Sequence, residues 1–141
     1  LDGKDHSECV ETKEEQNQFD RIKDHLDRHL NETWYQEIPL YSNRLGVAGR
    51  VDLIGLYKGR PTIIDFKTSR KLKRKDWIHD YFMQASFYAM SLYEMTEFPI
   101  KDLTILMSVD KGADLQIFHE KVGDWMEPLY DRINEYKEIH K

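Results

Sequence analysis

A two-residue turn between two strand-like segments constrains this chain more than any other feature of its sequence. Residues 47–57 and 61–66 are rich in β-branched and aliphatic side chains, and Lys58-Gly59 supplies the tight connection between them. A turn at this point starts an antiparallel pairing that fixes every later partner. In that register Asp52 stands directly opposite Asp65.

The predicted register gathers charged groups on one face of the sheet. Because side chains alternate between the two faces of a strand, Lys67 shares a face with Asp65, while Phe66 points into the core with Ile64. Carboxylates opposed at about 5 Å repel each other. The arrangement therefore favours a cation bound between Asp52 and Asp65, and oxygen ligands suit hard divalent ions such as Mg²⁺.

The main chain offers a third metal ligand. The carbonyl of Phe66 can turn toward the metal if the strand ends its pairing there. The same register places Arg50 opposite Lys67, two like charges that a bound phosphodiester would separate. Lys67 would then orient the attacking water and offset charge on the phosphoryl oxygens. We therefore expect a phosphodiester hydrolase with one or two Mg²⁺ or Mn²⁺ ions as cofactor.

The remaining segments predict helices packed on a mixed sheet. Apolar spacing and turn residues predict helices over 14–30, about 76–94 and 122–139, further strands over 34–41, 103–109 and 115–119, and a loop or frayed end over 1–13. Asn31 is the expected stop of the first helix. The order α-β-β-β-α-β-β-α indicates an α+β fold, and 141 residues suffice for a single domain.

Composition excludes several classes of site. The 21 Lys and Arg and 26 Asp and Glu give a net charge of −5, so any contact with a polyanion must be local. The single cysteine, Cys9, excludes an intrachain disulfide and any cysteine-based zinc site. No apolar run approaches the roughly 20 residues of a membrane span. We expect an intracellular, cytoplasmic protein with no membrane contact.

One segment carries the local positive charge that a nucleic acid needs. Six cations fall within the nine residues from Lys67 to Lys75. Such a cluster would contact phosphates and make binding depend steeply on salt. We expect Arg70, Lys71 and Lys73 to bind substrate, with a solvated loop as the alternative.

Three motifs in series resemble those of the PD-(D/E)XK nucleases. They are G-x-x-D at residues 49–52, D-x-K-T-S at 65–69 and Q-x-x-x-Y at 84–88. Within that superfamily they are most similar to the RecB-type exonuclease branch, which includes the mitochondrial genome-maintenance exonuclease and related phage exonucleases. The resemblance implies a restriction-endonuclease-like core, and Val51 stands where the superfamily name has proline.

The resemblance also assigns roles to single residues. It makes Asp52 and Asp65 the metal-binding carboxylates, with Phe66 a main-chain ligand and Lys67 the catalytic lysine. Glu37 matches an acidic residue that the branch carries on the preceding strand near the metal. Gln84 and Tyr88, one helical turn apart, match a motif that helps to position the substrate strand.

The branch normally begins with a helix that carries a G-T-x-x-H-x-x-x-E pattern. That pattern is missing here, and Asp2-Gly3-Lys4 resembles the turn that follows it, so we expect the helix to lie upstream of Leu1. The resemblance implies a DNA exonuclease acting on single-stranded DNA or DNA ends, in repair or recombination. The alternatives are a structure-specific endonuclease of the same fold and an inactive nuclease-fold module that binds DNA.

Two pairs of residues outside the motifs have both a functional and a structural interpretation. Trp77 and Tyr81 could stack on unpaired bases, but we expect them to pack in the core. His25 and His29 have the four-residue spacing of a helical two-histidine metal site. No third ligand follows in a matching pattern, so we expect both histidines to face solvent.

Overall fold

The computed structural model describes residues 6–44, 46–110 and 115–139, with side chains from residue 16 onward. Its elements are α1 (His6–His29), β1 (Leu30–Ser42), β2 (Val47–Tyr57), β3 (Arg60–Ser69), the 3₁₀-helix η1 (Lys75–Trp77), α2 (His79–Thr96), β4 (Asp102–Val109), β5 (Gln116–Lys121) and α3 (Val122–Ile139). The strands form one mixed sheet in the order β1-β2-β3-β4-β5, with β3 and β4 parallel. The predicted α+β class and element order are confirmed.

The hairpin between β2 and β3 has the predicted register. Tyr57 faces Arg60, and pairing runs to Leu53 opposite Ile64. Lys58 and Gly59 both have positive φ, as a two-residue hairpin turn requires.

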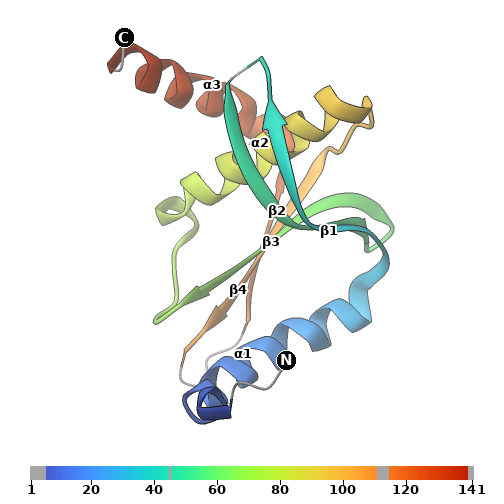
Figure 1. The fold of residues 1–141 in the computed structure, drawn as a ribbon, viewed down its shortest axis with the longest axis vertical. Coiled ribbons are helices and arrows are strands. Elements are labelled where there is room, and N and C mark those ends of the chain that lie inside the picture. Colours follow the sequence, from blue (N-terminus) through green and yellow to red (C-terminus); the bar gives the residue numbers. More distant parts are fainter. Residues whose placement is uncertain (1–5, 45, 111–114, 140–141) are drawn as a thin grey trace.

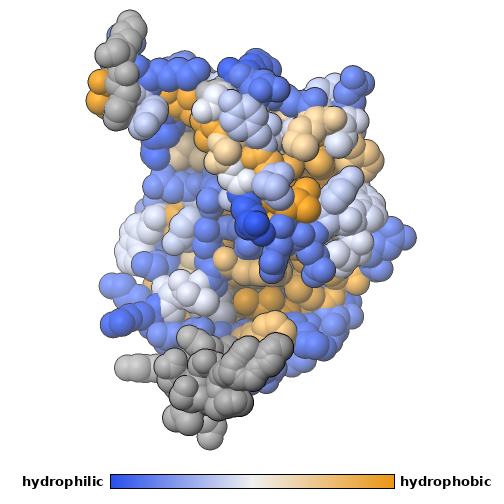
Figure 2. Space-filling model, viewed as in Figure 1, coloured by the Kyte–Doolittle hydropathy of each residue, from blue (hydrophilic) through white to orange (hydrophobic). Residues whose placement is uncertain are grey.

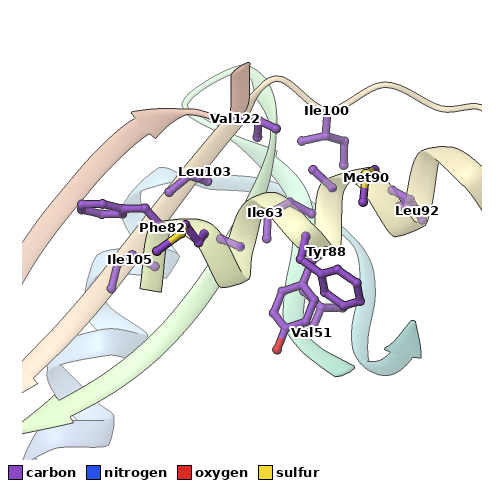
Figure 3. Packing of buried hydrophobic residues seen from close by; sticks show 14 of the residues in the cluster. Val51, Ile63, Phe82, Tyr88, Met90, Leu92, Ile100, Leu103, Ile105 and Val122 are labelled. Carbon is purple, nitrogen blue, oxygen red and sulfur yellow. The ribbon is translucent and has the colours of Figure 1, made fainter. Parts of the chain in front are cut away.

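Because side chains alternate between the two faces of each strand, the sheet carries two apolar cores, one under α2 and one under α1. Figure 1 shows these two helices on opposite sides of the sheet. On one face α2 covers Ile63 and its neighbours, and Figure 3 shows Phe82 of α2 near Leu103 and Ile105 of β4, and Met90 of α2 near Ile100. On the other face α1 packs through Ile22 and Leu26 against Ile64 and Leu106. Each fully buried aliphatic or aromatic side chain contributes about 1.5–3 kcal/mol, so both helices are fixed relative to β3.

Three helix boundaries differ from those that periodicity predicts. Residues 6–13 are helical rather than loop, because residues 11–16 are mostly strong helix formers and need no apolar stripe. Helix α1 ends at His29, and Asn31 lies in β1 instead, where its side-chain Oδ1 accepts the N–H of Gly59 at 2.8 Å. Helix α2 begins at His79, after η1. Residues 1–5 of the expected loop and 111–114 of the β4–β5 turn lie outside the described residues.

Hydrophilic side chains predominate on the surface in Figure 2, interrupted by hydrophobic patches over the strands and helices. The helices that the structure describes include none that is both long and apolar enough to cross a membrane.

The prediction that His25 faces solvent is wrong. Its exposed fraction is 6%, because α1 turns this position toward the sheet, where Nε2 lies 2.6 Å from the Tyr57 hydroxyl. His29 is half-buried beside it, with ring centroids 4.5 Å apart. Burial, followed by the charges of His29 and Lys58, lowers the pKa of His25 to about 4.

We expect the folded state to lose stability between about pH 6.5 and about pH 4, because over this interval His25 takes up a proton only in the unfolded chain. Because the pKa of His25 is lower in the folded state than in the unfolded chain, the stability that neutral His25 contributes is complete above about pH 6.5. It is lost as the pH falls from there to the folded-state pKa of about 4. The shift corresponds to about 3 kcal/mol. Urea unfolding across this pH range should show a smaller acid loss for His25→Gln than for the wild type. The exposed His79→Gln is the control, and equal acid losses in all three proteins would contradict the prediction.

Candidate active site

The strands β2 and β3 separate at the position of the predicted carboxylate pair. Their ladder ends at Leu53 opposite Ile64, after which β2 stays paired with β1 and β3 stays paired with β4. Figure 1 shows the two strands diverging. We call this place, with Asp52 on one strand and Asp65 to Lys67 on the other, the β2–β3 fork.

Asp52 replaces the missing ladder bond at the fork. Its Oδ2 accepts the N–H of Phe66 at 2.8 Å. Because the N–H and C=O of one residue in a strand point to the same edge, the Phe66 carbonyl also faces the gap between the strands. The predicted register therefore ends one step before Asp52 and Asp65, but their carboxyl groups still meet.

The predicted like-charge pair between Arg50 and Lys67 is wrong. The ladder has ended before these residues, so Arg50 instead pairs with Pro39 of β1. Its guanidinium donates to the main-chain oxygen of Glu37 at 2.9 Å. The separation of the strands leaves Lys67 facing α2.

Asp65 is buried, with an exposed fraction of 3%. Its Oδ2 lies 2.9 Å from Lys67 Nζ, but the contact lacks hydrogen-bond geometry, and this oxygen has no hydrogen-bond partner among the described residues. Burial and a hydrogen bond with Asp52 raise the pKa of Asp65 to about 7, against the opposing effect of Lys67. Without a cation the buried Asp65 carboxyl therefore takes up a proton near neutral pH, and a divalent cation bound there would displace that proton.

Lys67 is held by residues of α2 as well as by Asp65. Its ammonium donates to Gln84 Oε1 at 3.0 Å and lies 4.5 Å from the centroid of the Tyr81 ring. Tyr81 and Gln84 are three residues apart on one face of α2, where this spacing makes side chains neighbours. Sequence reasoning missed the role of Tyr81, although this spacing is visible in the sequence.

Tyr88 connects the first motif to the third. Its ring is buried against Gly49, where an added Cβ would lie 2.8 Å from Tyr88 Cε1, so only glycine permits this approach. Burial, followed by the charges of Asp65 and Asp52, raises the pKa of Tyr88 to about 12, and hydrogen bonds to the Arg50 main chain and the Gln84 side chain oppose the shift. Tyr88 therefore remains a neutral phenol beside the carboxylates.

The Glu37 side chain does not join the group formed by Asp52, Asp65 and Lys67. It occupies the register position opposite Asp52, between the pairs Gln36–Leu53 and Ile38–Val51, but its side chain is exposed and its φ is 49°. In the described part of the chain no three His, Cys, Asp or Glu side chains are grouped as a metal site. Its role near a metal stays a prediction.

The basic segment follows directly from the end of β3. Arg70 and Lys71 are exposed, and Lys73 is anchored because its main-chain N–H and C=O both bond the Gln116 side chain, at 2.9 and 3.0 Å. Two other cations of the segment form ion pairs, Arg74 with Asp76 and Lys75 with Glu120.

The predicted core position of Trp77 is wrong. Its exposed fraction is 56%, with the Arg74 guanidinium 5.7 Å from its ring centroid. Trp77 belongs to η1, which buries none of its residues, because α2 begins only at His79. Tyr81, by contrast, packs against the core as expected and also contacts Lys67.

Comparison with models of protein families gives a match that covers most of the chain. A family model described as the PD-(D/E)XK nuclease superfamily matches residues 5–133. This range includes all five strands and α2, and therefore the three motifs that meet at the β2–β3 fork. The comparison with curated proteins gave no match.

We expect Gly49→Ala to destabilise the fold by about 1–3 kcal/mol, because the new methyl group overlaps the Tyr88 ring. Urea unfolding of the wild type, Gly49→Ala, Tyr88→Leu and the double variant Gly49→Ala/Tyr88→Leu measures the effect. The double variant should lose less stability than the two single changes together, because leucine vacates the contested space. Gly123→Ala, which meets nothing within 4 Å, is the control. A Gly49→Ala protein as stable as this control would show that the contact is unimportant.

Proposed function

Because this chain belongs to the PD-(D/E)XK nuclease superfamily, we propose that it is a divalent-metal-dependent DNA exonuclease of the RecB-type branch. It hydrolyses phosphodiester bonds in single-stranded DNA or at DNA ends. Family membership indicates a nuclease acting on nucleic acid. The observation that carries the finer proposal is the β2–β3 fork. There the buried Oδ2 of Asp65 lies 2.9 Å from Lys67 Nζ and has no hydrogen-bond partner among the residues that the structure describes, and Asp52 lies beside it.

The donor set of the fork fits a hard divalent cation. Nucleases of this superfamily generally use such metals, and the fork offers oxygen atoms only: the carboxylates of Asp52 and Asp65 and the Phe66 carbonyl. These residues would hold one or two Mg²⁺ or Mn²⁺ ions, with Glu37 as a further acid from β1. When bound, such an ion polarises the scissile phosphate and lowers the pKa of a water molecule.

The other residues of the fork act on water and substrate. Lys67 orients the attacking water and offsets the negative charge that develops on the phosphoryl oxygens. Gln84 and Tyr81 hold the Lys67 ammonium in place, at 3.0 Å and 4.5 Å. Tyr88, a neutral phenol, positions the strand together with Gln84.

We also propose that the nucleic-acid strand reaches the β2–β3 fork along the basic segment. Arg70, Lys71 and Lys73 follow β3 directly, so phosphates next to the scissile bond would meet them. Because the chain has a net charge of −5, this contact is local and sensitive to salt.

We expect Lys67→Ala to lower cleavage of a linear single-stranded oligonucleotide in Mn²⁺ by about 10²–10³-fold, because the charge on the phosphoryl oxygens loses its cation. Asp65→Asn should also abolish Mn²⁺ binding in calorimetry. Lys121 and Asp102 form a comparable ion pair on the same sheet, at 2.6 Å, so Lys121→Ala and Asp102→Asn are matched controls that should behave as the wild type.

The substrates distinguish the alternatives. Cleavage of a circular single strand would indicate an endonuclease. DNA binding without cleavage, and without any Mn²⁺ effect in either the wild type or Asp65→Asn, would indicate an inactive DNA-binding module and contradict the proposal.

A further inference from the structure

A groove leads away from the β2–β3 fork between the start of β2 and helix α3. It consists of two cavities of about 220 Å³ and about 510 Å³, which share the lining residues Val47, Ala48 and Ile133 and therefore lie next to each other. Figure 1 shows α3 running beside the tip of the β1–β2 hairpin. The Arg44 guanidinium lies 5.4 Å from the Tyr130 ring centroid and fixes this tip against α3. We call this feature the β2–α3 groove.

The inner cavity of the groove begins at the site itself. Gln84 and Tyr88 form part of its lining. Gln84 also accepts the hydrogen bond from Lys67 at 3.0 Å, so a single side chain separates the cavity from the catalytic lysine. A nucleotide strand with one phosphate at Lys67 would have its neighbouring nucleotide at this cavity.

The inner cavity suits a flat apolar ring. Apart from Gln84 and Tyr88 its lining is aliphatic or aromatic and uncharged, including Phe87, Leu129 and Ile133. Every nucleobase presents an apolar face to such surfaces, and stacking on side chains requires that the base is not already stacked in a duplex. The cavity therefore favours an unpaired base.

The outer cavity adds the positive charge that a phosphate group needs. Its two charged lining residues, Arg132 and Lys137, are both basic, although the chain as a whole carries a net charge of −5. Arg132 pairs with Asp80 at 2.9 Å, but both side chains are more than half exposed. Exposed pairs of this kind are weak, so a phosphate can compete for the guanidinium.

We infer that the β2–α3 groove is a nucleotide subsite that takes an unpaired base in its inner cavity and the next phosphate at Arg132 and Lys137. The inference rests on the proposed function and defines its substrate class. The strand must present at least one unpaired base beside the scissile phosphodiester. A fully paired strand then reaches Lys67 only after its end has opened.

Filling the inner cavity tests the base contact. Ala48→Trp places a bulky side chain there from an exposed strand position, and Ile133→Trp does so from α3. Ile117→Trp on β5 is the matched control, since Ile117 is 38% exposed and lines neither cavity. Cleavage in Mn²⁺ is measured on an oligothymidylate and on copies in which one abasic residue is moved stepwise along the strand. Thermal unfolding of each variant checks that it is folded.

We expect one abasic position to lower kcat/KM of the wild type roughly 5- to 150-fold, the range for loss of a single stacked base. The filled-groove variants should show a similar loss on the intact strand, mainly through KM, and no further loss at that abasic position. The control should follow the wild type.

Charge removal gives a second, independent readout. Arg132→Gln/Lys137→Gln should reduce the slope of log affinity against log salt by about 0.7 for each phosphate that the variant no longer neutralises, while Lys121→Gln should not.

Equal cleavage of intact and abasic strands by the wild type and by both tryptophan variants would overturn the inference and leave the proposed function standing. Absence of all cleavage by the wild type would instead refute the proposed function. A change from dimer to monomer in Ala48→Trp, with unchanged cleavage, would make the groove an interface between copies and also overturn the inference.

Discussion

The chemistry of this molecule depends on where the pairing of β2 with β3 stops. A continued ladder would bond the Phe66 N–H and C=O to the neighbouring strand and leave no room for a ligand. Instead, Asp52 Oδ2 accepts the Phe66 N–H at 2.8 Å, so the edge of β3 is satisfied by a side chain. The carbonyl beside it and the buried carboxyl of Asp65 then face a space between strands that are each still paired on their other side. The sheet thus supplies a rigid opening without an unpaired strand.

The chemistry also requires a fixed distance between the opening at the β2–β3 fork and helix α2. Large apolar side chains such as Phe82 and Leu92 bury α2 on the sheet. The same helix then presents Tyr81 and Gln84 to Lys67. Core packing therefore sets the position of the ammonium group, and Gly49 sets how closely the Tyr88 ring approaches β2. The three sequence motifs are distant in the chain but meet because the core determines the placement of α2.

Local rules predicted much of this arrangement. The turn at Lys58-Gly59 predicted the hairpin register, and strand alternation predicted that Asp65 and Lys67 share a face. Long-range packing decided what could not be predicted: the end of the ladder beyond Leu53, and the exposure of Trp77. The burial of His25 likewise depends on how α1 crosses the sheet, because a histidine on an amphipathic helix carries no local sign of the Tyr57 hydroxyl that will meet it.

The two faces of β3 explain why register matters more here than composition. The side chains of Ile64 and Phe66 anchor α1, whereas Asp65 and Lys67 face α2. Phe66 serves both faces, because its ring packs in one core while its main chain borders the fork. A slip of one residue would exchange these faces, burying a carboxylate and an ammonium under α1 and placing an aromatic ring in the fork. The tight turn that sets the register therefore determines the stability of one core and the chemistry of the opposite face together.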